Sequence, residues 1–234
     1  MDEELEQFLM EVGLAVNARC RSAFESSSDL TEEVNTSPAD IIYKIDVEAE
    51  EVIVQLMEEN AHRFGGIILL AEGIGEDDLS IYPDGLGQED AQTKIICDPI
   101  DGSRGLMFAK RPAFFLGAGG KASAKKLSEL DVSVMVELPI PKQSQWDILS
   151  ARRGRGTNVN RYHENGQITK IDFKPDAKKS IEGGFCSFAK FCYPGKDFIA
   201  KVEELFFDAL FANKEEEYLP AFDDQYIFEK YLFP

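Results

Sequence analysis

Apolar residues that recur every three or four positions predict two helices at the start of the chain. The first stripe consists of Leu5, Phe8, Leu9, Val12, Ala15, Val16 and Cys20. This spacing places the side chains on one side of a helix, and the acidic residues before it suit the positive end of the helix dipole. The second stripe follows Asp46 and contains Val47, Ile53, Leu56, Met57 and Phe64. Asp46 is therefore expected to be the N-cap of the second helix, and the polar segment 26–38 is expected to be a loop.

Short apolar or alternating runs bounded by glycine or proline predict a series of strands after residue 66. They cover residues 67–71, 94–97, 113–118, 132–138, 146–151 and 167–173. The acidic, glycine-rich stretch 73–92 is expected to be a long loop or hairpin, and an apolar stripe over 197–211 predicts a further helix. The order helix, helix, strands, helix indicates an α+β layered arrangement and not a strict βαβ alternation.

The composition is that of an acidic globular protein. The 234 residues include 43 acidic and 25 basic side chains, for a formal net charge of −18, yet 44% of the residues are hydrophobic. That hydrophobic share excludes global disorder. The negative charge argues against binding to a nucleic-acid polymer or to an anionic membrane, because both require a basic surface. No apolar run approaches the ~20 residues that span a bilayer.

Cysteine and histidine usage favours a reduced, cytoplasmic protein. The four cysteines form no Cys-x-x-Cys pair, and the two histidines lack zinc-ligand spacing. The first ten residues are acidic and lack the basic region of a secretory signal, so no such signal is expected.

The segment 98–105, which reads Asp-Pro-Ile-Asp-Gly-Ser-Arg-Gly, carries the chemistry. Asp98 and Asp101 lie three residues apart at the end of a predicted strand, and Gly102 allows close approach to the backbone before Ser103. A helix start here would offer N–H groups to an anion. Carboxylates beside an anion site make sense when a cation lies between them, and oxygen ligands with a phosphate favour Mg²⁺. An Asx-Pro turn with a capping aspartate remains the alternative for this segment.

Two further acids could join this segment. Glu72 ends one predicted strand as Asp98 follows another, so neighbouring strands could bring both carboxylates to one edge of a sheet. Asp46, at the predicted start of the second helix, could lie beside them.

These residues resemble the inositol monophosphatase-like, lithium-sensitive phosphatases. Residues 98–103 match the family's DPIDG(T/S) motif. Residues 40–46 are similar to its segment that leads to a helix-start aspartate, and residues 70–73 are similar to its strand end with a glutamate. Residues 151–156 resemble its AR-x-G-x-G hairpin. The resemblance runs from about residue 5 to 226; the DPIDG motif is specific, and the others occur in the family's order.

The resemblance implies a metal-dependent phosphoric monoester hydrolase with two or three Mg²⁺ ions. Its metal ligands would be Glu72, Asp98, Asp101, the carbonyl of Ile100 and a late aspartate. Ser103, which stands where the family more often has threonine, would orient the attacking water together with Glu72, and Asp46 would lie beside the water or a further metal. The N–H groups of Gly102 and Ser103 would bind phosphate.

The late metal ligand is expected to be Asp224, with Asp223 as the fallback. In the family this ligand is the aspartate of a WD-x-x-A-G motif at a late helix start. The pair Trp146-Asp147 is the wrong match, because it lies in a predicted strand just before the 152–156 hairpin. A plain pair of helix-capping acids at 223–224 remains open.

Arg104 has two interpretations that the sequence does not separate. It could contact substrate phosphate or sugar hydroxyls, or it could pair with one of the many acids.

The expected fold is the α/β layered, sugar-phosphatase type, with alternating helix and sheet layers. We expect an N-terminal subdomain over residues 1–150, with the metal and phosphate motif, and an incomplete C-terminal subdomain over 151–234. The resemblance also implies a homodimer. Since only ten residues follow Asp224, where the family continues, truncation, a divergent end or completion by a second subunit is expected.

Other phosphate chemistries fail on residue patterns. The chain has no GxxxxGK[ST] motif, and the Asp98–Asp101 spacing is too wide for the haloacid-dehalogenase type. The glycine cluster 117–120 is expected to be a hairpin turn and not a dinucleotide site. The competing hypothesis of another class is a catalytically weak relative that acts as a binding or assembly module. The expected substrate is a small polyol or sugar phosphate, with inositol phosphate, fructose bisphosphate and a nucleotide 3′-phosphate all open.

Overall fold

The computed structural model describes residues 2–26, 33–36, 41–174, 194–212 and 221–222, together with positions 177, 179, 184, 185 and 188. The chain forms two compact units, Met1–Phe173 and Lys174–Pro234.

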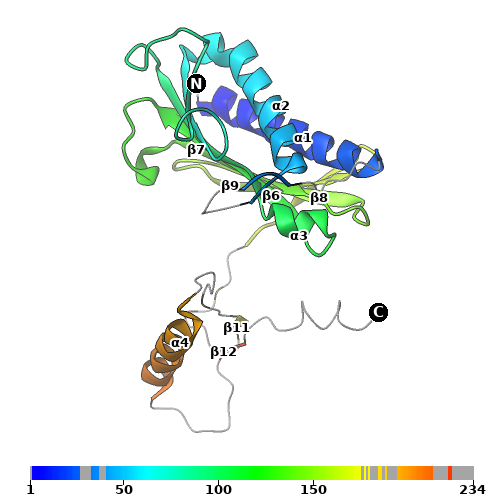
Figure 1. Ribbon diagram of the computed structural model, residues 1–234, viewed down its shortest axis with the longest axis vertical. Coiled ribbons are helices and arrows are strands. Elements are labelled where there is room, and N and C mark those ends of the chain that lie inside the picture. Colours follow the sequence, from blue (N-terminus) through cyan, green and yellow to red (C-terminus); the bar gives the residue numbers. More distant parts are fainter. Residues whose placement is uncertain are drawn as a thin grey trace. The chain divides into compact units, whose positions relative to one another are not determined.

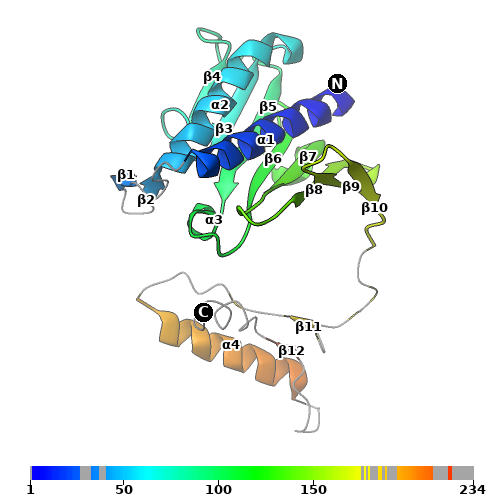
Figure 2. The ribbon, with the colours of Figure 1, turned by 90° about the vertical axis from the view of Figure 1, so that its right-hand side faces the viewer.

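The first unit packs a pair of helices on one face of an eight-stranded sheet (Figures 1 and 2). The helices are α1 (Asp2–Glu25) and α2 (Lys44–Asn60), and α2 continues into the 3₁₀ turn η1 (Ala61–Phe64). The strands, in spatial order, are β10 (Ile168–Ile171), β9 (Gly156–His163), β8 (Gln145–Arg152), β7 (Val132–Leu138), β6 (Ala113–Lys121), β5 (Thr93–Asp101), β3 (Ile67–Ala71) and β4 (Leu79–Tyr82). Of these pairings only β3–β5 is parallel. The result is the expected α+β layered fold.

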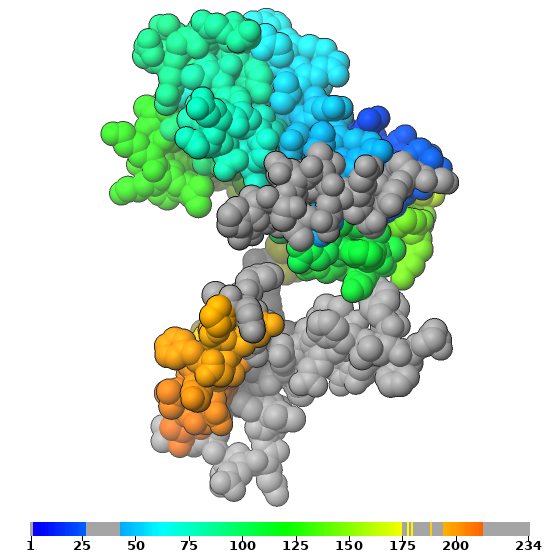
Figure 3. Space-filling model, in the orientation of Figure 1, coloured from blue at the N-terminus to red at the C-terminus, as the bar shows by residue number. Residues whose placement is uncertain are grey.

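The core lies between the helix pair and the sheet. The apolar stripe of α1 is buried, with Phe8, Leu9 and Val12 fully inaccessible, and alternate residues of the central strands meet it, such as Phe115 and Val136. The space-filling view shows α2, in cyan, adjoining the blue-green surface around β4 (Figure 3), where the Asp84 N–H donates to the Glu58 carboxylate. Burial of the apolar side chains between the helices and the sheet supplies the main stabilisation of the unit.

Glycines let α1 approach the sheet closely. A Cβ atom on Gly13 would lie 2.5 Å from Cγ2 of Val136, and one on Gly119 would lie 2.9 Å from Cδ2 of Leu5. The prediction of a hairpin turn at 117–120 was therefore wrong. These glycines lie inside β6, and Gly119 accommodates the helix.

Several element boundaries differ from the sequence prediction. The predicted loop 26–38 contains β1 (Glu33–Thr36), which pairs antiparallel with β2 (Ile41–Tyr43). The stretch 73–92 contains β4. Helix α2 begins at Lys44, so Tyr43 is the N-cap and Asp46 is the third helical residue. Asp46 still satisfies the helix start, because its Oδ2 accepts the Tyr43 N–H at 3.0 Å.

The second unit contains the predicted late helix. Helix α4 spans Lys196–Phe211, and the short strands β11 (Gly184–Phe185) and β12 (Ala221–Phe222) pair in parallel. Four aromatic rings cluster in this unit: Phe188, Phe206, Phe207 and Phe211. Residues 150 and 151, between which the sequence analysis placed the boundary of two subdomains, both lie in strand β8 of the first unit. None of the helices in the described ranges is both long and apolar enough to cross a membrane.

Candidate active site

The parallel pairing of β3 with β5 brings the ends of these strands to the same edge of the sheet. In the register, Leu70 pairs with Ile96 and Ala71 pairs with Cys97, so Glu72 follows β3 level with Asp98. Residues two apart in a strand share a face, so Asp98 lies on the face of Ile96, opposite the buried Cys97. The carboxylates of Glu72 and Asp98 interact electrostatically.

A hydrogen bond between Asp46 and Ser103 connects helix α2 to the segment that follows β5. Ser103 Oγ lies 2.6 Å from Oδ1 of Asp46 and 3.0 Å from the carbonyl oxygen of Ile100. The hydroxyl has one proton, and the carboxylate is the stronger acceptor, so Ser103 donates to Asp46. Ser103 also begins α3 (Ser103–Met107), which follows Gly102 in the left-handed region at φ 100°.

Burial and crowded negative charge perturb the pKa of Asp98. Burial raises the pKa of Asp98 to about 6, and the charges of Glu72, Asp101 and Asp46 add to the effect. The Ile100 N–H, which donates to Oδ1 of Asp98 at 3.1 Å, acts in the opposite direction on this pKa. Such a shift is typical of carboxylates at functional sites.

Glu50 is a member of this acidic cluster that the sequence prediction missed. It follows Asp46 by one helical turn, and a Cβ atom on Gly73 would lie 2.3 Å from its Oε1. Burial, with the charges of Asp46, Glu51 and Glu72, raises the pKa of Glu50 to about 7. The spacing of four residues from Asp46 was the available sequence signal, since residues i and i+4 share a helix face.

The donor chemistry of this cluster fits a hard cation. Its side-chain donors are all carboxylates that repel one another, and oxygen ligands of this kind suit Mg²⁺. Within the described ranges, no three histidine, cysteine or acidic side chains form a group that could hold a metal ion. The predicted late ligands Asp223 and Asp224 lie outside the described residues.

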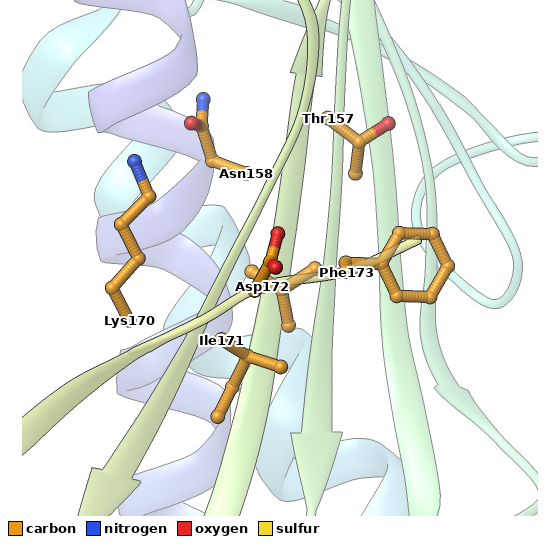
Figure 4. Close-up of a pocket in the computed structure, with 7 residues that line it drawn as sticks. Thr157, Asn158, Lys170, Ile171, Asp172 and Phe173 are labelled. Atoms are coloured by element: carbon orange, nitrogen blue, oxygen red, sulfur yellow. The ribbon is translucent and has the colours of Figure 1, made fainter. Parts of the chain in front are cut away.

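Asp98 also lines a large hollow on the sheet. The hollow has a volume of about 590 Å³, and its other lining residues include Leu116, Met135, Leu149 and Thr157. A second hollow of about 340 Å³ lies at the β9–β10 edge, with Asn158 and Lys170 on one side and Thr157 and Phe173 on the other (Figure 4). None of the candidate acids lines this second hollow.

Two other predicted residues have defined contacts. Nε of Arg104 donates to the hydroxyl of Tyr43 at 3.3 Å. Asp147, which the sequence analysis rejected as a metal ligand, lies in β8. It forms a bidentate ion pair with Arg161, whose Nε and Nη2 donate to its two carboxylate oxygens at 2.8 Å each.

Comparisons of sequence and of structure give different outcomes. No family model matches the sequence, and no curated protein matches it significantly. Among solved structures, fructose-1,6-bisphosphatase of Leishmania major superposes with a TM-score of 0.61 at 14% identity, covering 95% of this chain and 68% of the other. The extragenic suppressor protein SuhB of Bartonella henselae superposes with a TM-score of 0.57 at 16% identity, covering 87% of this chain and 67% of the other.

A third structure names the family. CysQ from Bacteroides thetaiotaomicron, described as a bacterial member of the inositol monophosphatase family, gives a TM-score of 0.52 at 15% identity, with 86% of this chain and 69% of the other covered. The chain has the inositol monophosphatase-like fold. The resemblance inferred from residues 98–103 is thus confirmed for the fold. The chain spans about two thirds of the length of these inositol monophosphatase-like structures.

Proposed function

We propose that the protein is a Mg²⁺-dependent phosphomonoesterase that hydrolyses a small polyol or sugar phosphate. The observation that carries the proposal is that Glu72, directly after β3, lies level with Asp98 in the neighbouring parallel strand β5, with a raised pKa at Asp98. Three structural neighbours with the same fold, among them a fructose-1,6-bisphosphatase, support a phosphatase.

Two or three Mg²⁺ ions would be held by Glu72, Asp98, Asp101, the carbonyl of Ile100 and Asp224. Bound Mg²⁺ would supply neutralisation of the ester, a lowered pKa for water and stabilisation of the leaving oxygen.

Ser103 and Glu72 would orient the attacking water. Because the Ser103 hydroxyl donates its proton to Asp46, its oxygen can only accept a hydrogen bond from water. Asp46 is held in turn by the Tyr43 N–H, so the serine rotamer is fixed before substrate arrives. Positioning of this kind supplies a large share of the rate in phosphoryl transfer.

The loop after β5 would hold the substrate. The N–H groups of Gly102 and Ser103 would bind the phosphate oxygens, and Arg104 would contact phosphate or sugar hydroxyls. The Tyr43 hydroxyl, which accepts from Nε of Arg104, would help to orient the guanidinium.

Phosphate release from a panel of esters tests the proposal. The panel contains an inositol monophosphate, fructose 1,6-bisphosphate and a nucleoside 3′-phosphate, each with Mg²⁺ and with a chelator. We expect release from at least one ester with Mg²⁺ only, and the preferred ester defines the substrate class. A folded protein that releases no phosphate from any ester would contradict the proposal and favour a binding or assembly role.

The late ligand requires its own comparison. Replacement of Asp224 by Asn should abolish the Mg²⁺-dependent release, whereas replacement of Asp223 by Asn should preserve most of it. The reverse result would move the ligand to Asp223.

A further inference from the structure

The side chain of Arg111 lies along the loop that follows β5. The N–H groups of Lys110 and Arg111 both donate to the carbonyl of Gly105, at 2.9 and 3.3 Å, and so fold the chain back after α3. A Cβ atom on Gly105 would lie 2.8 Å from Cγ of Arg111 and 2.9 Å from its Nε. One on Gly102 would lie 3.7 Å from Nη2. The arginine stem therefore rests on Gly105, and its terminal nitrogen is directed to Gly102.

The absence of a side chain at position 105 gives the Arg111 stem room. Gly105 lies inside helix α3, and its φ is not in the left-handed region, so an alanine there has an allowed backbone conformation. Any side chain at 105 would meet Arg111, because real Cβ atoms do not approach other atoms within 3.0 Å. Gly105 thus leaves the space that the Arg111 stem occupies.

Among the residues that the structure describes, Arg111 has no acidic partner, unlike most of the other arginines. Six arginines form ion pairs with carboxylates: Arg19, Arg21, Arg63, Arg152, Arg153 and Arg161. In the part of the chain that the structure describes, the exposed Arg111 side chain forms neither an ion pair nor a hydrogen bond. In a protein with 43 acidic residues, an arginine held in place without a carboxylate is available for another anion.

We propose that Arg111 binds the phosphate group of the substrate, next to the N–H of Gly102. A guanidinium offers two parallel N–H donors that match two oxygens of a phosphate. The inference rests on the proposed function, since it assigns the phosphate of that reaction to a further residue. Gly105 is then a positioning residue.

Calorimetric titration with inorganic phosphate in saturating Mg²⁺ tests the assignment on the full chain. We expect Arg111→Gln to weaken phosphate binding at least about tenfold, because a charge-assisted hydrogen bond is lost. Arg111→Lys should recover part of the affinity. The charge-matched control is Arg155→Gln, in the turn between β8 and β9, and it should bind as the wild type does.

Gly105→Ala tests the placement independently. It should weaken binding as Arg111→Gln does, and the double variant should bind no more weakly than Arg111→Gln alone, because both changes remove the same contact. The KM for the preferred ester should rise in the same order, with kcat changing less. Thermal unfolding of each variant establishes that it is folded.

The outcomes separate this inference from the proposed function. If the wild type binds phosphate and Arg111→Gln binds it equally well, the assignment of Arg111 is wrong and the phosphatase proposal stands. If the effects of Gly105→Ala and Arg111→Gln add, the placement through Gly105 is wrong. If the wild type neither binds phosphate nor releases it from any ester, the proposed function fails, and this inference fails with it.

Discussion

Ser103 donates a 2.6 Å hydrogen bond to Asp46 across 57 positions of the sequence. The bond joins the first turn of α2 to the first residue of α3, and the proposed chemistry requires these two segments together. Asp46 uses its other oxygen to accept the Tyr43 N–H. One carboxylate therefore fixes both the helix start and the serine hydroxyl.

Replacement of Ser103 by alanine should separate orientation of the water from substrate binding. We expect kcat for Mg²⁺-dependent phosphate release to fall by about 100-fold with little change in KM, because the attacking water loses the group that aligns it. Ser103→Thr keeps the hydroxyl and is the matched control, which should retain most of the activity. An alanine variant with wild-type kcat would remove Ser103 from the mechanism.

Glu50 should make the metal-free protein less stable as the pH rises. The pKa of Glu50 is about 7 in the folded state, above its ordinary value of 4.5, so the folded state binds the proton more tightly than the unfolded state. Its contribution to stability is therefore present below pH 4.5 and is lost as the pH rises through about 7.

Thermal unfolding in a chelator measures this effect. Glu50→Gln should raise the melting temperature at pH 8 and change it little at pH 4. Glu59→Gln, at an exposed position of the same helix, should show no such pH dependence. An equal shift at both pH values for Glu50→Gln would show that ionisation of Glu50 does not destabilise the fold.

Replacement of Gly13 by alanine should destabilise the fold. Alanine normally favours a helix by about 1 kcal/mol over glycine, but here its methyl group would lie 2.5 Å from Cγ2 of Val136. Overpacking of this kind costs about 1–3 kcal/mol, so we expect a net loss of stability in denaturant unfolding. Val136→Ala should cost less in the Gly13→Ala background than alone, because it makes room for the methyl group. A stabilised Gly13→Ala protein would contradict the close packing.

The fold was predictable where burial leaves a periodic pattern. Helix α1 and strands β3 and β7 match their predicted ranges because one helix face or one strand face is apolar. Strand β9 was not predicted as a strand. Its sequence, Gly-Thr-Asn-Val-Asn-Arg-Tyr-His, has one buried residue, Val159, so pairing with β8 and β10 sets its conformation without an apolar signature.

The candidate site was predictable where its residues directly follow an apolar run. Glu72 and Asp98 each directly follow an apolar run, and strand pairing alone makes them neighbours. Arg111 was not predictable, because its place depends on the contact with Gly105 and on how the chain folds back after α3. Backbone turns of this kind leave no periodic pattern in the sequence.

The most direct test of the account compares two substitutions of aspartate by asparagine. Mg²⁺-dependent phosphate release from the preferred ester is measured for the wild type, Asp98→Asn and Asp147→Asn. Asp147 is the matched control because its carboxylate pairs with Arg161 at the protein surface, where such pairs contribute little to stability. We predict that Asp98→Asn loses at least about 1,000-fold in rate, or about 4 kcal/mol of transition-state stabilisation, while Asp147→Asn stays near wild type. Full activity in a folded Asp98→Asn protein, or an equal loss in both variants, would contradict the assignment of Asp98 to a metal-dependent phosphatase site.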